Sequence, residues 1–332
     1  MKCKKFPRCI AWAFLWVVAG VATLWAAAAL YFDLRIPWLR LPLAMIYGLG
    51  MLAVWIFVRR PWKLVATGAG FAIVLAWWFT LQPSNDRDWQ PDVAILPYAD
   101  INGNEVTIHN IRNCDYRTET DFDVQHYDRT FDLDQLRTLD LYLVTWGSPH
   151  IAHTMVSFGF TNGDHVCCSI ETRKEKGEDY SAVKGLFRRF ELTYVIADER
   201  DLVRLRTNYR AGEEVCLYRL QATPEEARKA FLDYMRRINE LHEHAEWYNA
   251  ITENCTTAIR TQRDVADRAP WDWRILLNGH LDELLYEHGM IATNLPFAEL
   301  KKLSNINARA RAADKAADFS QQIRNGLPGF DR

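Results

Sequence analysis

The stretch from Ala152 to Arg173, AHTMVSFGFTNGDHVCCSIETR, is the clearest sign of how this chain folds. Two runs rich in apolar residues, Ala152–Phe160 and Val166–Arg173, flank the segment TNGDH. Asn-Gly between apolar runs is a strong hairpin signal, because both residues accept the positive φ angles of a tight turn. The sequence therefore predicts an antiparallel hairpin, with His153 near the start of its first strand.

Further strand-like runs lie on both sides of the hairpin, namely Glu105–Ile111, Leu139–Trp146, LTYVIADERD, VRLRTNY and Glu214–Gln221. A helix follows them. Thr223 suits its N-cap, Pro224 its first turn, and Glu226 would complete a capping box. Beyond it, the alanine-rich segment from Asn305 to Gln322 predicts a surface helix. We expect an α+β domain over residues 93–310 and a basic, alanine-rich tail over residues 311–332.

The N-terminal region, residues 1–82, has a different character. It contains three long uncharged stretches, at about residues 9–32, 41–58 and 64–81. A hydrocarbon core about 30 Å thick needs roughly 17–25 helical residues, so all three predict transmembrane helices. A cleaved signal peptide is the alternative for the first stretch. That stretch is longer than a typical signal core of about 7–15 residues, which favours a membrane span.

Basic residues predict the orientation of these helices. Lys2, Lys4, Lys5 and Arg8 precede the first stretch, and RRPWK, from Arg59 to Lys63, connects the second to the third. Because basic segments stay in the cytoplasm, the N-terminus is expected there. Three spans then place everything after the linker, residues 83–92, on the far side. The prediction is a multi-pass protein of the bacterial inner membrane with a periplasmic C-terminal domain.

Charge and metal-ligand patterns narrow the function. The formal net charge is −2 and no basic patch dominates the soluble part, so a nucleic-acid partner is not expected. A zinc site is the competing interpretation for His150, His153, His165 and the Cys167–Cys168 pair, with His242 and His244 as further donors. Neighbouring residues on a strand point to opposite faces, so the two cysteines would not share a metal easily. We therefore expect no metal and no cofactor.

Cys255 stands in the run EWYNAITENCTTAIR, Glu246–Arg260. If a helix begins near Asn254, its N–H groups and dipole would stabilise a thiolate. A nucleophilic thiol needs a base, and His153 is the best placed histidine. A histidine at a strand start beside a cysteine at a helix start is typical of papain-like thiol enzymes, although papain has the opposite chain order. From spacing alone, a structural histidine remains the alternative.

Several segments, in the same order, resemble the periplasmic domain of Lnb-type bacterial lipoprotein N-acyltransferases. Among them are IAHTMVSFGF, SIETRKEKGE, VIADERDLVRLRTNYR and WYNAITENCTTAIR, and the similarity runs from about Val106 to Ala308. That family is similar to permuted NlpC/P60-like, papain-type thiol enzymes. The resemblance implies that His153 and Cys255 form the catalytic pair. In this chain three spans are expected before the domain and none after it. This arrangement departs from that of the acyltransferase, so the resemblance supports family membership better than it supports the same substrate.

The third catalytic residue is predicted to be Glu171, which follows His153 across the hairpin and could orient its imidazole. A surface glutamate paired with Arg173 or Lys174 is the alternative. Asn254 could cap the helix or help to form an oxyanion site. The predicted function is a membrane-anchored acyltransferase that takes a lipid or lipoprotein substrate and carries the acyl group on Cys255. The alternatives are a cysteine peptidase or amidase acting on peptidoglycan peptides or envelope protein, and a non-catalytic envelope scaffold.

Overall fold

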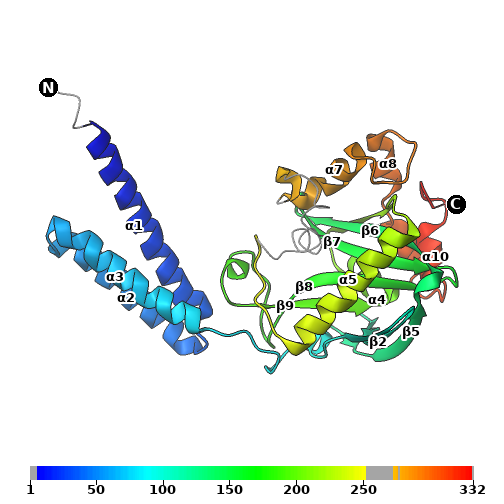
Figure 1. Cartoon of the computed structure of the whole chain (residues 1–332), viewed down its shortest axis with the longest axis horizontal. Coiled ribbons are helices and arrows are strands. Elements are labelled where there is room, and N and C mark those ends of the chain that lie inside the picture. The colour runs from blue at the N-terminus through cyan, green and yellow to red at the C-terminus, as the bar shows by residue number, and fades with distance from the viewer. Residues whose placement is uncertain (1–5, 252–271, 276, 331–332) are drawn as a thin grey trace. The chain divides into compact units, whose positions relative to one another are not determined.

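The computed structural model describes residues 6–251, 272–275 and 277–330, with side chains from residue 12 onward. These residues form two compact units. The first comprises Met1–Pro83 together with Ser181–Phe190, and the second comprises Ser84–Tyr180 and Glu191–Arg332. Figure 1 shows the chain from its N-terminal helices to its C-terminal segment.

The first unit is built on three apolar helices, α1 (Phe6–Asp33), α2 (Pro37–Phe57) and α3 (Arg60–Thr80). Each is long and apolar enough to cross a membrane, as the sequence predicted. Helices α2 and α3 begin a few residues earlier than expected and have a proline in their first turn. Proline is accepted there because the first N–H groups of a helix have no partner within it.

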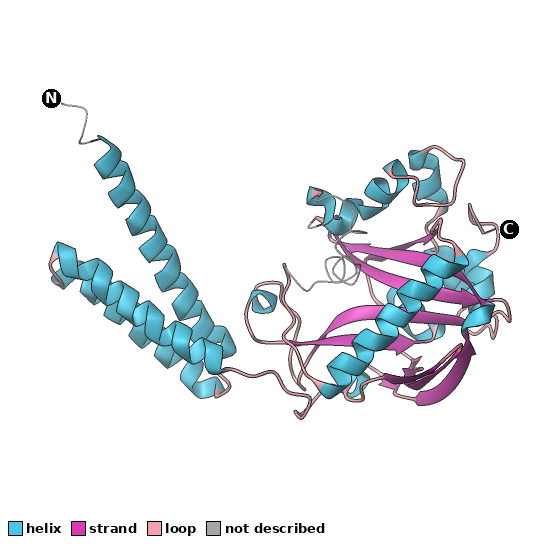
Figure 2. Cartoon of the chain, viewed as in Figure 1, coloured by secondary structure: helices cyan, strands magenta, loops and turns pink. Residues whose placement is uncertain are grey.

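The second unit is a mixed α+β domain around an eight-stranded sheet (Figure 2). Its strand order is β1-β2-β9-β8-β7-β6-β10, and β5 also pairs with β2. Strands β2 and β9 run parallel; the other pairs are antiparallel. The strand bounds are β1 Tyr98–Asn102, β2 Glu105–Arg112, β5 His126–Asp132, β6 Leu136–Trp146, β7 Ser148–Phe160, β8 His165–Arg173, β9 Glu191–Ala197 and β10 Glu213–Arg219. A separate two-stranded sheet joins β3 (Asp115–Tyr116) to β4 (Phe122–Asp123).

The predicted hairpin is confirmed as β7 and β8. Met155 pairs with Ser169, and Gly163 in the turn has a φ of 87°. Cys167 and Cys168 are both buried, on opposite faces of the sheet. This alternation gives β7 two different sides, with Phe158 on one and His153 on the other.

Helix α5 (Pro224–Glu243) covers the Phe158 side (Figure 1). Phe231 of this helix lies against Phe158, with 5.1 Å between their ring centroids. The predicted capping box of Thr223 and Glu226 is present. Shorter helices complete the unit, α4 (Glu199–Arg204), α7 (Leu281–Glu287), α8 (Phe297–Leu303), α9 (Asn307–Ala312) and α10 (Phe319–Arg324). On the other side of the sheet, side chains from α4, α9 and α10 join the core that contains Tyr142, Met155 and Val215.

The strand expected for VRLRTNY is wrong. The segment LTYVIADERD is a strand only as far as Ala197; Asp198 is the N-cap of α4, which begins at Glu199, and Leu205–Tyr209 continues as a π-helix. The alternation of apolar residues and arginines was misleading because both sets are buried. Arg204 is 2% exposed and Arg206 is 5% exposed.

The expected surface helix over residues 305–322 is also wrong. The segment forms two short helices, α9 and α10, and the side chains of Ala310, Phe319 and Ile323 are fully buried. Arg324 is buried too, where it donates hydrogen bonds to Asp140 (2.8 Å) and Glu199 (2.7 Å). The residues predicted to be a tail therefore complete the core.

Candidate active site

The side chain of His153 marks the candidate site. His153 lies near the start of β7 and is 8% exposed. Its Nε2 atom is 2.7 Å from the Oγ of Ser169 and 3.1 Å from Oε1 of Glu171, both on β8. The structure thus brings together two of the predicted site residues, His153 and Glu171.

The hydrogen bonds around Ser169 indicate the tautomer of His153. Ser169 donates its only hydroxyl hydrogen to Oε1 of Glu171, at 2.7 Å. Its oxygen can therefore only accept from Nε2, which must carry a hydrogen. In the neutral imidazole the lone pair is then on Nδ1. The arrangement prepares His153 to accept a proton through Nδ1.

Arg206 helps to keep the carboxylate of Glu171 ionised. Its Nη2 donates to Oε1 of Glu171 at 2.9 Å, and its Nη1 lies 3.2 Å from Glu213. Burial alone would raise the pKa of Glu171. The charges of His153 and Arg206, with hydrogen bonds from His153 and Ser169, instead hold this pKa well below its ordinary value. Glu171 therefore stays ionised and stabilises a positive imidazolium.

Arg206 itself comes from the π-helical segment Leu205–Tyr209. Burial alone would lower the pKa of Arg206, but Glu171 and Glu213 raise it above the ordinary value. Short π-helical segments occur frequently at functional sites because they re-aim single side chains. Sequence reasoning assigned no role to Arg206 or Ser169. The available signal for Ser169 was its position two residues before Glu171, on the same face of the strand.

The other two predicted site residues, Cys255 and Asn254, lie outside the described residues. The structure therefore places only the histidine and carboxylate part of the predicted constellation. The catalytic roles remain predictions.

This histidine–carboxylate pair lies in a part of the sequence that matches a known protein family. Residues 123–279 match the family model of the Lnb N-terminal periplasmic domain. No match to the chain is found among curated proteins or among solved structures. The Lnb-matched stretch includes His153, Ser169, Glu171 and Arg206, and it also includes the sequence position of Cys255.

The four cysteine thiols that the structure describes lack the lowered pKa of a nucleophilic cysteine. Cys114, Cys167, Cys168 and Cys216 are not in disulfides. Burial raises the pKa of Cys114 to about 12 and that of Cys216 to about 11, and it raises the pKa of Cys167 and Cys168 further. Since the thiolate is the reactive form, all four stay protonated and unreactive near neutral pH.

The histidines considered for zinc do not form a cluster. His150 Nδ1 lies 2.9 Å from Nε2 of His280, whereas His153 faces Ser169 and Glu171. Within residues 6–251, 272–275 and 277–330, no group of three or more histidine, cysteine or acidic side chains is arranged to hold a metal ion.

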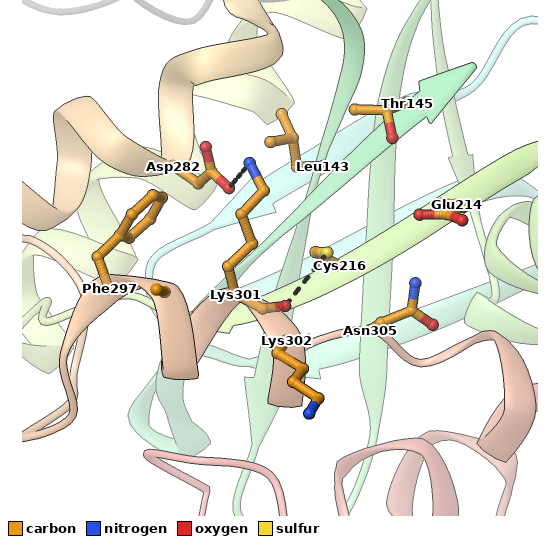
Figure 3. Close-up of a pocket in the computed structure, with 10 residues that line it drawn as sticks. Leu143, Thr145, Glu214, Cys216, Asp282, Phe297, Lys301, Lys302 and Asn305 are labelled. Atoms are coloured by element: carbon orange, nitrogen blue, oxygen red, sulfur yellow. Dashed lines mark hydrogen bonds and ion pairs between the residues drawn. The ribbon is translucent and has the colours of Figure 1, made fainter. Parts of the chain in front are cut away.

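A cavity of about 600 Å³ lies on one face of the sheet (Figure 3). Leu143 and Cys216, register partners on β6 and β10, form its floor, and Phe297 and Lys301 of α8 form a wall. Lys301 is paired with the buried carboxylate of Asp282 at 2.9 Å. Val144, the next residue of β6, pairs with His153 and points the other way. The cavity is therefore separate from the candidate active site.

Proposed function

We propose that the Lnb-matched domain is a thiol-dependent acyltransferase with a papain-like arrangement of its catalytic residues. Cys255 is the nucleophile, His153 the base and Glu171 the residue that orients His153. The observation that supports this most directly is the 3.1 Å contact between Nε2 of His153 and Oε1 of Glu171. The four protonated thiols elsewhere in the domain also favour Cys255 as the reactive one.

The proposed first step transfers the acyl group to the enzyme. Nδ1 of His153 accepts the thiol proton of Cys255, because Nε2 is already bonded to Ser169 and Glu171. The thiolate attacks the carbonyl carbon of an ester. A carbon–sulfur bond forms, the carbon–oxygen bond breaks, and the imidazolium returns its proton to the leaving alcohol. Backbone N–H groups near Asn254 would stabilise the oxyanion.

The second step releases the acyl group. An amine attacks the thioester carbon while His153 takes the amine proton. The carbon–sulfur bond then breaks, and the thiolate recovers that proton. Water in place of the amine would make the same machinery a hydrolase. General-base assistance of this kind contributes about 10²–10⁴-fold to the rate.

The proposed substrates are lipids and lipoproteins of the bacterial envelope. Three apolar helices long enough to span a bilayer precede the domain in the chain. We infer that they span the inner membrane with the N-terminus in the cytoplasm and the domain in the periplasm. An anchored thiol enzyme would then work where acyl donors are concentrated.

Intact-protein mass spectrometry of the full chain in lipid nanodiscs tests the proposal. After incubation with a diacylated lipopeptide, the wild type should gain one acyl mass on Cys255, and His153→Ala should not. Cys216→Ser is the matched control and should still be acylated. Release of the acyl group by an added amine supports transfer. Cleavage of peptidoglycan fragments without any acyl adduct would identify a hydrolase instead. A Cys255→Ala variant that fully complements a deletion would leave only the scaffold role.

A further inference from the structure

The segment Ser181–Phe190 lies between β8 and β9 in the sequence, but it packs within the unit of the three apolar helices. Its sequence, SAVKGLFRRF, has three basic residues and no acidic residue. The segment contains one short 3₁₀ turn, Lys184–Leu186. The backbone N–H of Gly185 donates to Ser181 at 2.9 Å, and that of Phe187 donates to Lys184 at 3.1 Å.

Phe187 anchors the segment to α1. It is 8% exposed and belongs to a buried cluster with Ala26, Ala29 and Val74. Its ring centroid is 5.1 Å from that of Phe32 and 6.3 Å from that of Trp25. Phe32 is next to the last residue of α1, so the segment docks near the C-terminal end of this helix.

Arg188 makes a second anchor on α3. Its Nη1 donates to the carbonyl oxygens of Trp78 (2.8 Å) and Leu81 (3.0 Å), and its guanidinium carbon is 3.8 Å from the centroid of the Trp78 ring. Trp78 in turn donates to Asp33 at 2.7 Å. A cation at the last carbonyls of a helix is favourable because the helix dipole is negative there.

The opposite surface of the segment combines apolar and basic side chains. Val183 and Leu186 are 52% and 41% exposed and flank the partly exposed Lys184. Arg189 is also partly exposed. On α3, Phe79 is 60% exposed. Exposed apolar residues mixed with lysine and arginine are typical of segments that lie at the interface of a bilayer.

We propose that Ser181–Phe190, together with the C-terminal ends of α1 and α3, binds the head groups of anionic phospholipids. Lys184 and Arg189 attract the phosphates, and Val183 and Leu186 enter the acyl boundary. The occupant is the bilayer itself, because the surface is continuous with helices whose apolar side chains need lipid around them. Aromatic residues such as Trp78 and Phe79 mark the same depth. This surface goes beyond the proposed thiol chemistry and does not depend on Cys255.

Hydrogen–deuterium exchange of the full chain in nanodiscs tests this surface. Discs of phosphatidylcholine are compared with discs containing phosphatidylglycerol. The peptide covering residues 181–190 should exchange more slowly when phosphatidylglycerol is present. In Lys184→Gln/Arg189→Gln, the affinity of the segment for the phosphatidylglycerol surface should fall about fivefold per charge removed, so that protection at a fixed phosphatidylglycerol content decreases. Val183→Ser/Leu186→Ser should lose protection in both kinds of disc.

The controls separate lipid binding from other causes. Lys176→Gln/Arg236→Gln removes two exposed charges outside the segment and should keep the wild-type response. Cys255→Ser should also keep it, so that failure of this proposal is distinct from failure of the acyltransferase. Free glycerol phosphate should give no protection; if it does, the site binds a soluble anion. Equal protection in both kinds of disc, or an unchanged response of the Lys184/Arg189 variant with a wild-type melting temperature, overturns the proposal.

Discussion

His153 and Glu171 lie opposite one another on neighbouring strands, two residues along from the register pair of Met155 and Ser169, with Nε2 and Oε1 3.1 Å apart. The geometry follows from the tight turn between β7 and β8. Since the turn fixes the register, it also fixes which carboxylate faces the imidazole. The pairing leads to the first prediction.

Replacing either partner should lower the rate of acyl transfer without a large change in substrate affinity. His153→Ala removes the base and should reduce kcat about 10²–10⁴-fold. Glu171→Gln keeps the shape but loses the charge behind the imidazolium, and it should give a smaller loss. Single-turnover acylation of Cys255 measures both. Glu214→Gln, on the other side of the sheet, is the control. Equal rates for wild type and Glu171→Gln would contradict an orienting role.

The pH dependence of stability should reveal the same carboxylate. The folded-state pKa of Glu171 lies well below 4.5, the ordinary value. A lowered pKa adds stability that is fully present above about pH 4.5 and is lost as pH falls toward the folded pKa. Thermal unfolding of wild type and Glu171→Gln at several pH values checks this. The two melting temperatures should differ most at neutral pH and converge below pH 4.5; a constant difference would argue against the shift.

Thiol reactivity should distinguish Cys255 from the described cysteines. The pKa of Cys216 is raised to about 11, so its alkylation should be slow at pH 7 and accelerate toward pH 11. Cys255 should react first at pH 7, and His153→Ala should slow that reaction. Peptide mass spectrometry after brief exposure to iodoacetamide gives the order of labelling. Faster labelling of Cys216 than of Cys255 would count against a thiolate at position 255.

Arg324 should be essential for the stability of the domain. Arg324→Leu removes the arginine that pairs with the buried carboxylate of Glu199 and leaves the buried carboxylate of Asp140 to Arg219, which costs about 3–5 kcal/mol. The exposed Arg236→Leu is the matched control and should change the free energy of unfolding by less than about 0.5 kcal/mol. Replacing all three charged residues, Asp140→Asn/Glu199→Gln/Arg324→Leu, should be less harmful than removing the arginine alone. Chemical unfolding in nanodiscs measures each difference.

The close approach of Gly279 to β7 should also affect the site. A Cβ atom at Gly279 would overlap the backbone of Pro149 and His150, and neighbouring Asn278 accepts a hydrogen bond from the N–H of Ala152 at 2.8 Å. Gly279→Ala should therefore shift the start of β7, which carries His153. We expect a lower melting temperature and slower acylation together. Gly177→Ala is the control. Gly177 has a φ of 77° and open space around it, so this variant shows the effect of backbone strain without any overlap.

The parts of the fold that the sequence predicted were those with a strong local signal. The Asn-Gly turn, the capping box at Thr223 and the three apolar stretches each depend on neighbouring residues alone. Segment 203–209 and the C-terminal helices depend on distant partners instead. Arg206 is buried because Glu171 and Glu213 lie next to it, and no local pattern indicates that.

The residues of the candidate site also differ in how far the sequence could predict them. Glu171 could be placed opposite His153 because a hairpin relates the two by counting residues. Arg206 reaches Glu171 from 35 residues farther along the chain, through a helix that was predicted as a strand. The packing of Ser181–Phe190 against the apolar helices could not be predicted either, since Phe187 and Arg188 have no sequence pattern that distinguishes them from ordinary loop residues.

The ion pair between Asp140 and Arg324 has a consequence for the timing of folding. The two residues are 184 positions apart, and Leu327 is also fully buried in the core. The central strands therefore cannot close their hydrophobic face before α10 (Phe319–Arg324) has been made. The sheet stays partly uncovered until α10 packs on it. A domain whose closing contact is so distant in sequence should fold slowly and expose apolar strand surface, which favours aggregation, until that contact forms.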